Sequence, residues 1–173
     1  MKNHLAFLLV TASLVVPAGM QAKTAKPVDL PQAVRHSLAM MARFNVFDEI
    51  SYQVDGSTVT LTGEVTQPVV KEDASRTVQR VEGVTQVVNN IEVLPLSDND
   101  ERIREAELRA IYTAPTLAGR YVPANPAIRI IVKNGVVRLE GVVANKMDHD
   151  VAGIRANGVF GAFQVINNLK IES

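Results

Sequence analysis

Apolar residues alternate with polar ones in two pairs of neighbouring segments, and each pair predicts a β-hairpin. Nearly every second position of each segment is apolar, as in a strand that buries one face. The four predicted strands are residues 50–54, 59–65, 128–132 and 137–143. Asn134-Gly135 separates the second pair, and both residues tolerate the positive φ of a two-residue type I′ turn. The turn of the first pair is either Asp55-Gly56 or Gly56-Ser57, and both alternatives leave the same side chains facing the core.

Helical spacing of apolar residues predicts one helix before and one helix after each hairpin. Asp29 and Asp98 are the expected N-caps of the leading helices, and Thr66 and Asn145 are those of the trailing helices. The trailing helices and the closing strands are residues 67–81, 146–157, 85–93 and 163–171. The helix residues expected to face the cores are Val34, Leu38, Met41, Val70, Ala74, Val81, Ile103, Ala106, Ala110, Met147, Val151 and Ile154.

The chain matches itself at an offset of 78 residues, without a gap, from residues 50–93 onto residues 128–171. The positions that coincide include Gly63 with Gly141 and Asn89-Asn90 with Asn167-Asn168. The same register favours Gly56-Ser57, in a type II′ turn, for the first hairpin. The sequence therefore predicts an α+β protein of two tandem αββαβ modules, each a small three-stranded sheet packed against two helices. The predicted modules are residues 29–95 and 96–173.

The two copies differ most between their first helix and first strand. In the first copy residues 45–49 connect the helix to the strand. In the second copy the connection is residues 113–127, which contain three prolines and a glycine. A long proline-bearing loop inside a compact domain is usually functional or mobile. The linker at residues 94–97 is short, so the two modules are expected to stay close together.

Residues 1–22 have the pattern of a cleavable signal peptide. Lys2 is positive, residues 5–16 are apolar, and small residues follow. Cleavage is expected after Ala22, with Ala18 as the alternative. The apolar run is too short to span a bilayer, and no cysteine follows it to carry a lipid anchor. We therefore expect a soluble mature protein that is exported to the periplasm.

Charge is balanced overall but differs between the two copies. The chain has 18 basic and 18 acidic residues, which argues against a protein that binds nucleic acid through a basic excess. Residues 23–95 carry seven basic and nine acidic residues, and residues 96–173 carry ten and nine. The first copy is therefore net negative and the second is net positive.

The repeated residues resemble the pattern of the BON domain. In the first copy this pattern is Val59-Thr60-Leu61-Thr62-Gly63-Glu64-Val65, then Ala74, then Gly83 to Ile91, and the second copy repeats it with Ala162 where the pattern favours Val. Paired copies behind a signal peptide are similar to the osmotically induced periplasmic proteins of this family. The resemblance implies association with phospholipid membranes or envelope partners without catalysis, and it supplies no catalytic residue.

Few side chains could support catalysis or metal binding. Beyond the predicted signal peptide the chain has only two histidines, His36 and His149, and it has no cysteine. Asp148-His149-Asp150 contains metal-binding residue types, but neighbours on a helix point in different directions and do not converge. No nucleophile motif surrounds Ser37 or Ser51. We therefore predict no enzymatic activity, no metal and no cofactor.

Basic and apolar residues gather in the first helix of the second copy and in the long segment after it. These candidate lipid- or partner-binding residues are Arg102, Arg104, Arg109, Ile111, Tyr112, Leu117, Arg120 and Tyr121. Arginine beside exposed apolar groups suits an anionic phospholipid surface, which would fit a role in envelope or osmotic stress. The alternative is an adaptor that docks an envelope protein through a sheet edge or through Ile131 and Val136. These two side chains either lie exposed on the outer sheet face or pack under the long segment or against the first copy.

Overall fold

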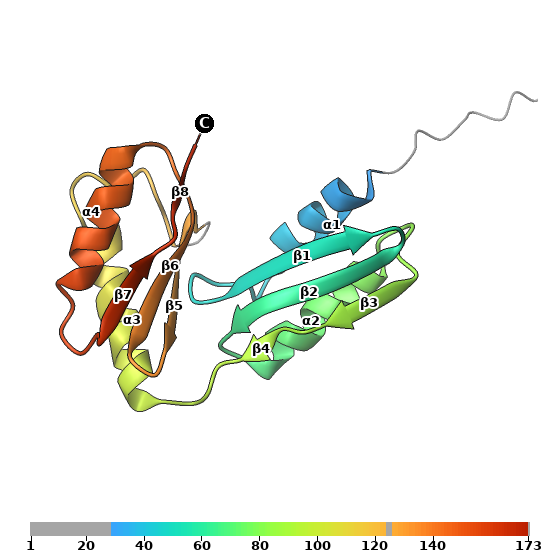
Figure 1. The fold of residues 1–173 in the computed structure, drawn as a ribbon, viewed down its shortest axis with the longest axis horizontal. Coiled ribbons are helices and arrows are strands. Elements are labelled where there is room, and N and C mark those ends of the chain that lie inside the picture. The colour runs from blue at the N-terminus through green and yellow to red at the C-terminus, as the bar shows by residue number, and fades with distance from the viewer. Residues whose placement is uncertain (1–28, 124–125, 173) are drawn as a thin grey trace, which may run out of the picture.

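The computed structural model describes residues 29–123 and 126–172, which form two α+β domains of the same plan (Figure 1). The predicted signal peptide lies outside the described residues. Domain 1 consists of α1 (Leu30–Ala39), β1 (Glu49–Asp55), β2 (Thr58–Val65), α2 (Pro68–Gln79), β3 (Gln86–Asn89) and β4 (Glu92–Val93). Domain 2 consists of α3 (Asp98–Tyr112), β5 (Ile128–Lys133), β6 (Val136–Val143), α4 (Lys146–Asn157), β7 (Gln164–Asn167) and β8 (Lys170–Ile171). The predicted fold class and tandem arrangement are confirmed.

The longest strand of each domain is the central one. β2 pairs antiparallel with β1 and parallel with β3 and β4, and β6 pairs in the same way with β5, β7 and β8. The closing strand is interrupted after Asn89, whose Oδ1 accepts the N–H of Ile91 at 3.2 Å while its Nδ2 donates to the carbonyl oxygen of Lys71 at 2.8 Å. Asn167 makes the equivalent pair of bonds in domain 2. The asparagine therefore has the same role in both copies: its side chain links the trailing helix to the interrupted closing strand.

Both hairpin turns have two residues, as the hydrophobic pattern predicts. Asn134 and Gly135 have φ values of 52° and 75°, as a type I′ turn requires. In domain 1, Asp55 pairs with Thr58, so Gly56-Ser57 is the turn and the register of the repeat identified it correctly.

Two repeated glycines hold the hairpins together where a side chain has no room. Gly63 has a φ of 123°, and a Cβ atom there would lie 2.1 Å from the carbonyl oxygen of Glu49. Gly141 has a φ of 124°, and its Cβ atom would lie 2.0 Å from the carbonyl oxygen of Ala127. Only glycine allows the strands this close approach.

The leading helix of domain 2 departs from the prediction at its cap and its buried face. Ser97, rather than Asp98, is the N-cap, because its hydroxyl oxygen accepts a first-turn N–H at 3.2 Å. The buried stripe consists of Ile103, Glu107 and Ile111. The expected Ala106 and Ala110 are only partly buried. The hydrophobic pattern therefore identified Ile103 correctly but missed the rest of the buried face, because a glutamate lies in the middle of it.

Part of domain 1 belongs to the core of domain 2. In the segment before β1, residues 45–48, Val46 is buried within the apolar cluster of domain 2 and Phe47 packs against it. The carbonyl oxygen of Val46 accepts the N–H of Ile130 in β5 at 2.9 Å. The guanidinium of Arg129 donates to two carbonyl oxygens of the same segment, at 3.0 and 3.3 Å. The core of domain 2 is therefore completed by its neighbour.

Three ion pairs join the facing surfaces of the two domains, and every cation lies on domain 2. The pairs are Arg129–Glu49, Lys133–Glu92 and Arg138–Glu64. The charge difference between the two copies thus contributes to their contact. Ile131, on the same face of β5, is only 1 % exposed, and Val136 is partly buried. The alternative in which these side chains are packed away is therefore correct for Ile131, and this face is not an open docking surface.

Candidate interaction surface of domain 2

Four of the candidate binding residues lie in the core of domain 2 rather than on its surface. They are Ile111, Tyr112, Leu117 and Tyr121. The segment between α3 and β5 folds back over the domain and buries them. The Tyr112 hydroxyl donates to the carbonyl oxygen of Ile128 at 2.5 Å, and burial raises the pKa of Tyr112 to about 12. The expectation that these side chains are exposed is wrong.

Tyr121 and Asp148 fix this segment to the beginning of α4. The Tyr121 hydroxyl donates to Asp148 Oδ2 at 2.8 Å and accepts the N–H of Ala144 at 2.9 Å. Arg120 Nη1 donates to the same Asp148 oxygen at 2.5 Å. Burial raises the pKa of Tyr121 above its usual range. Asp148, part of the Asp148-His149-Asp150 sequence, thus has a structural role. Arg120 is half exposed and forms an ion pair with it.

In domain 1 a different residue forms hydrogen bonds at the end of the central strand. The buried Asp48 accepts the N–H and the hydroxyl of Thr66 at 2.8 and 2.9 Å. Thr66, the expected cap of α2, corresponds to Ala144 in the repeat and makes no capping bond; α2 instead begins after Gln67. Asn145 caps α4 as predicted. An acid in one copy and a tyrosine in the other therefore close the end of the central strand.

The arginines of α3 divide into one buried and two exposed residues. Arg104 is buried, and it donates to the carbonyl oxygen of Val132 at 2.8 Å and to Glu101 at 3.0 Å. Arg102 and Arg109 remain exposed. Of the eight candidate residues, only these two and Arg120 have accessible charge.

Large apolar side chains are instead exposed along α4 and the loop that follows it. Met147 and Ile154, which we expected to face the core, are 64 % and 69 % exposed. Phe160 and Phe163, in the loop between α4 and β7, are 101 % and 86 % exposed. We call residues 146–163 the α4 segment. It holds four of the nine large apolar side chains that are exposed in the described part of the chain.

The face that α4 buries is made of small residues and one acid. Its buried residues are Asp148, Ala152, Gly153 and Ala156. A Cβ atom on Gly153 would lie 2.8 Å from Asn167 Nδ2, so the glycine allows the helix to approach β7 closely. Apolar residues occur on every side of α4, and for this reason their spacing did not identify the buried face.

The offset of 78 residues shows that this surface is particular to domain 2. Phe160 corresponds to Glu82, Phe163 to Thr85 and Ile154 to Arg76 in domain 1. This replacement of polar residues by apolar ones was visible in the sequence, because the aligned copies differ at positions that the shared fold leaves outside the core. Val151, Ile154 and Arg155 of the segment also line an open hollow beside the end of α3.

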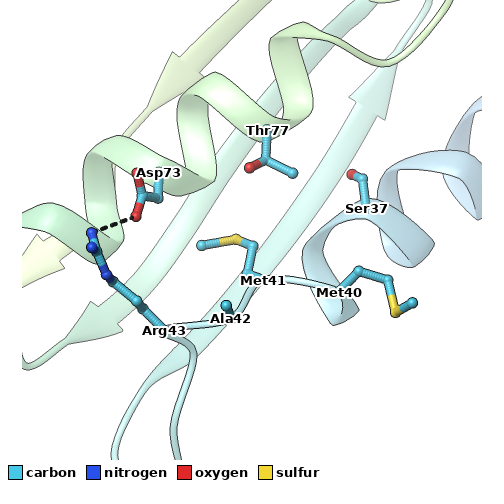
Figure 2. A pocket seen from close by; sticks show the side chains of 7 residues that line it. All are labelled: Ser37, Met40, Met41, Ala42, Arg43, Asp73 and Thr77. Atoms are coloured by element: carbon cyan, nitrogen blue, oxygen red, sulfur yellow. Dashed lines mark hydrogen bonds and ion pairs between the residues drawn. The ribbon is translucent and has the colours of Figure 1, made fainter.

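A surface hollow of domain 1 is lined by hydroxyl, thioether and charged side chains. Figure 2 shows the hollow between α1 and α2, where Met41 points toward α2, Met40 points away from it, and the dashed line joins Arg43 to Asp73. The one carboxylate among these side chains, Asp73, forms ion pairs with Arg43 and Arg76. Among residues 29–123 and 126–172, no group of three or more His, Cys, Asp or Glu side chains could hold a metal ion. None of the helices in these ranges is long and apolar enough to cross a membrane.

Glu107 is the most perturbed acid of domain 2. Its side chain is fully buried, and neither carboxyl oxygen has a hydrogen-bond partner among the described residues. Burial raises the pKa of Glu107 from 4.5 to about 8. The group is therefore mainly protonated at neutral pH.

Comparisons with known proteins agree with the repeat. The BON domain model matches residues 29–95 and 100–173. Osmotically-inducible protein Y of Escherichia coli (strain K12) is 30% identical over 124 residues, or 70% of this chain; the match spans 61% of that relative. Two solved structures of CdsD, a structural protein of the type III secretion system of Chlamydia trachomatis, cover 86% and 84% of this chain and 100% and 93% of theirs. Their identity is 11%, and their TM-scores of 0.35 and 0.34 support no conclusion about this chain.

Proposed function

This chain belongs to the BON domain family, and from that premise we propose that it is a non-catalytic periplasmic protein whose second domain associates with anionic phospholipid membranes. The similarity to an osmotically-inducible protein supports a role in envelope or osmotic stress. The observation that carries the proposal is the exposure of Met147, Ile154, Phe160 and Phe163 within the α4 segment. Exposed apolar groups that gather in one region are typical of membrane or protein contacts.

Insertion of the α4 segment into the headgroup region would bury its apolar side chains. Transfer of one phenylalanine side chain out of water contributes about 1.5–3 kcal/mol. Arg155 lies on the same segment, and Arg102 and Arg109 are exposed on α3. Each of these cations would add about 1 kcal/mol at an anionic surface. The proposed contact therefore moves from the predicted loop to α4, while two of the predicted arginines remain part of it.

Co-sedimentation with vesicles tests this proposal. We expect the protein to bind vesicles of phosphatidylcholine and phosphatidylglycerol more strongly than vesicles of phosphatidylcholine alone. The double variant Phe160→Ser/Phe163→Ser should bind at least about tenfold more weakly. Met40→Ser, which removes an exposed methionine of domain 1, is the matched control and should bind like the wild type.

The arginine variants separate the two contributions. Arg102→Gln/Arg109→Gln/Arg155→Gln should lose the preference for phosphatidylglycerol and keep weak binding to both vesicles. Absence of binding to either vesicle, or binding that the phenylalanine variant leaves unchanged, would refute the membrane proposal.

A cleft between the domains favours a protein-interaction adaptor as the second candidate. Ile50 and Tyr52 of β1 line it on one side, and Pro126 and Val142 line it on the other. Because β1 lies at the edge of its sheet, an extended peptide could add to it there (Figure 1). Recovery of one stoichiometric protein from envelope extract, abolished by Tyr52→Asp and independent of lipid, would support this candidate.

A further inference from the structure

We propose that domain 1 covers a second phospholipid-binding face of domain 2, and that separation of the domains uncovers it. This face, which we call the sheet face, is the outward side of β5 and β6. It contains Arg129, Ile131, Lys133 and Arg138. The inference rests on the proposed function, since it names a second contact with the same anionic phospholipid.

Carboxylates of domain 1 occupy the positions that phosphate oxygens of a headgroup would take. Arg138 directs two nitrogens at the two oxygens of Glu64, with Nη1 3.2 Å from Oε1. This fork geometry suits a carboxylate and a phosphate equally well. Lys133 Nζ donates to both oxygens of Glu92, at 2.7 and 2.8 Å. The cations are therefore already arranged to hold planar or tetrahedral oxyanions.

The sheet face is specific to domain 2 and is not a property of the shared fold. The positions that correspond to its four residues in domain 1 are Ser51, Gln53, Asp55 and Thr60. None of them is basic, and none is a large apolar residue. The face therefore combines charge and an apolar side chain as a membrane contact does, although Ile131 is now covered.

The contact between the domains has a salt-sensitive part and a salt-resistant part. Lys133 and Glu92 have 36% and 50% of their side chains exposed, so dissolved ions screen their attraction. Val46 is buried and hydrogen bonded to β5, and salt affects such a contact little. A rise in ionic strength should thus loosen the pair between Lys133 and Glu92 more than the two less exposed pairs, while residues 45–48 act as the pivot. The pair between Lys133 and Glu92, at the hairpin end of β5, should separate first.

The experiment removes the acids of domain 1 and leaves the sheet face intact. The interface variant carries Glu49→Gln, Glu64→Gln and Glu92→Gln. Its control carries the same loss of charge on exposed residues of domain 1, namely Asp55→Asn, Glu72→Gln and Glu82→Gln. Both are made in the wild type and in the Phe160→Ser/Phe163→Ser background, and binding to phosphatidylglycerol vesicles is measured by co-sedimentation.

We expect the interface variant to bind about tenfold more tightly than its control in both backgrounds, because Lys133 and Arg138 become available, whereas Arg129 stays bonded to residues 45–48. Adding Lys133→Gln and Arg138→Gln to the interface variant should remove the gain. Equal binding by the interface variant and its control overturns the inference, and so does a gain that survives loss of the two cations. If the wild type does not bind but the interface variant does, the sheet face stands and the proposed role of the α4 segment fails. If the wild type binds through its phenylalanines and the interface variant gains nothing, the proposed role of the α4 segment stands and the inference about the sheet face fails.

Discussion

Domain 1 and domain 2 share one fold, yet their surfaces differ in almost every feature that matters for binding. Domain 1 has Glu82 and Thr85 where domain 2 exposes Phe160 and Phe163. Its acids face the cations of domain 2 across the contact between them. The positions that coincide, such as Gly63 and Gly141, maintain the hairpins. The comparison shows that repeated positions preserve the fold, whereas the differing positions give domain 2 exposed apolar side chains and cations that domain 1 lacks.

The largest expected effect tests whether the two folds are equivalent. Gly63→Ala and Gly141→Ala should each destabilise their domain by about 3 kcal/mol or more, because the new Cβ atom meets a carbonyl oxygen and φ is positive. Chemical denaturation measures both losses. Gly119→Ala, at a positive φ in open space, is the control and should cost about 1 kcal/mol. A small effect at only one of the two positions would show that the hairpins are not equivalent.

Glu107→Leu should stabilise domain 2, because it removes a buried carboxyl that has no partner. The folded state holds the proton of Glu107 more tightly than the unfolded state, so stability falls as pH rises from about 4.5 to about 8. Above this window the variant should be more stable than the wild type by about 2–4 kcal/mol, and near pH 4 the gain should be smallest. Thermal unfolding from pH 4 to pH 9 measures the difference.

Glu105→Gln, at an exposed acid of the same helix, should leave the pH profile unchanged. A Glu107→Leu protein that loses stability with rising pH as steeply as the wild type would show that another group causes the dependence.

Tyr121→Phe should destabilise domain 2 by about 1–2 kcal/mol, because the N–H of Ala144 and the buried carboxylate of Asp148 both lose a partner. Tyr52→Phe in domain 1 removes only an exposed hydrogen bond to the carbonyl oxygen of Pro31 and should have a smaller effect. Denaturant unfolding compares the two variants. Equal losses would mean that the Tyr121 hydroxyl does not fix the segment after α3.

The smallest expected effect concerns the contact between the domains. A double-mutant cycle of Lys133→Gln and Glu92→Gln should give a coupling of about 0.3–1 kcal/mol at low salt. The coupling should decrease as NaCl is raised, because both side chains are partly exposed. A coupling that is independent of salt would indicate that this pair does not loosen with ionic strength.

The sequence predicted those parts of the fold in which local pattern and tertiary structure agree. The alternation of apolar residues, Asn134-Gly135 and the register of the repeat identified both hairpins, and Asn145 identified the beginning of α4. The prediction of the buried helix face failed where the core contains an ionisable group, as at Glu107. It also failed where apolar residues surround the helix, as at Met147 and Ile154. Spacing cannot distinguish the faces of such helices.

The candidate site was predicted only in part, for a related reason. Arg102 and Arg109 are exposed, but Tyr112, Leu117 and Tyr121 are core residues that resembled surface aromatic and aliphatic groups in sequence. Their burial depends on how the segment after α3 folds back, and no local signal specifies this. The short linker and the alternative packing of Ile131 indicated that the domains could touch, but nothing in the pattern of residues 45–48 indicates that Val46 belongs to the core of domain 2.

The packing of Val46 in domain 2 also bears on how such repeats can multiply. A domain that contributes a side chain to the core of its neighbour cannot be deleted without loss of that core contact. The same loss follows if the two domains are exchanged or placed in another order. The face of β5 that receives domain 1 has no counterpart on domain 1, where Ser51, Gln53 and Asp55 lie instead. Through this contact two repeats of one fold have become a pair whose members are no longer interchangeable.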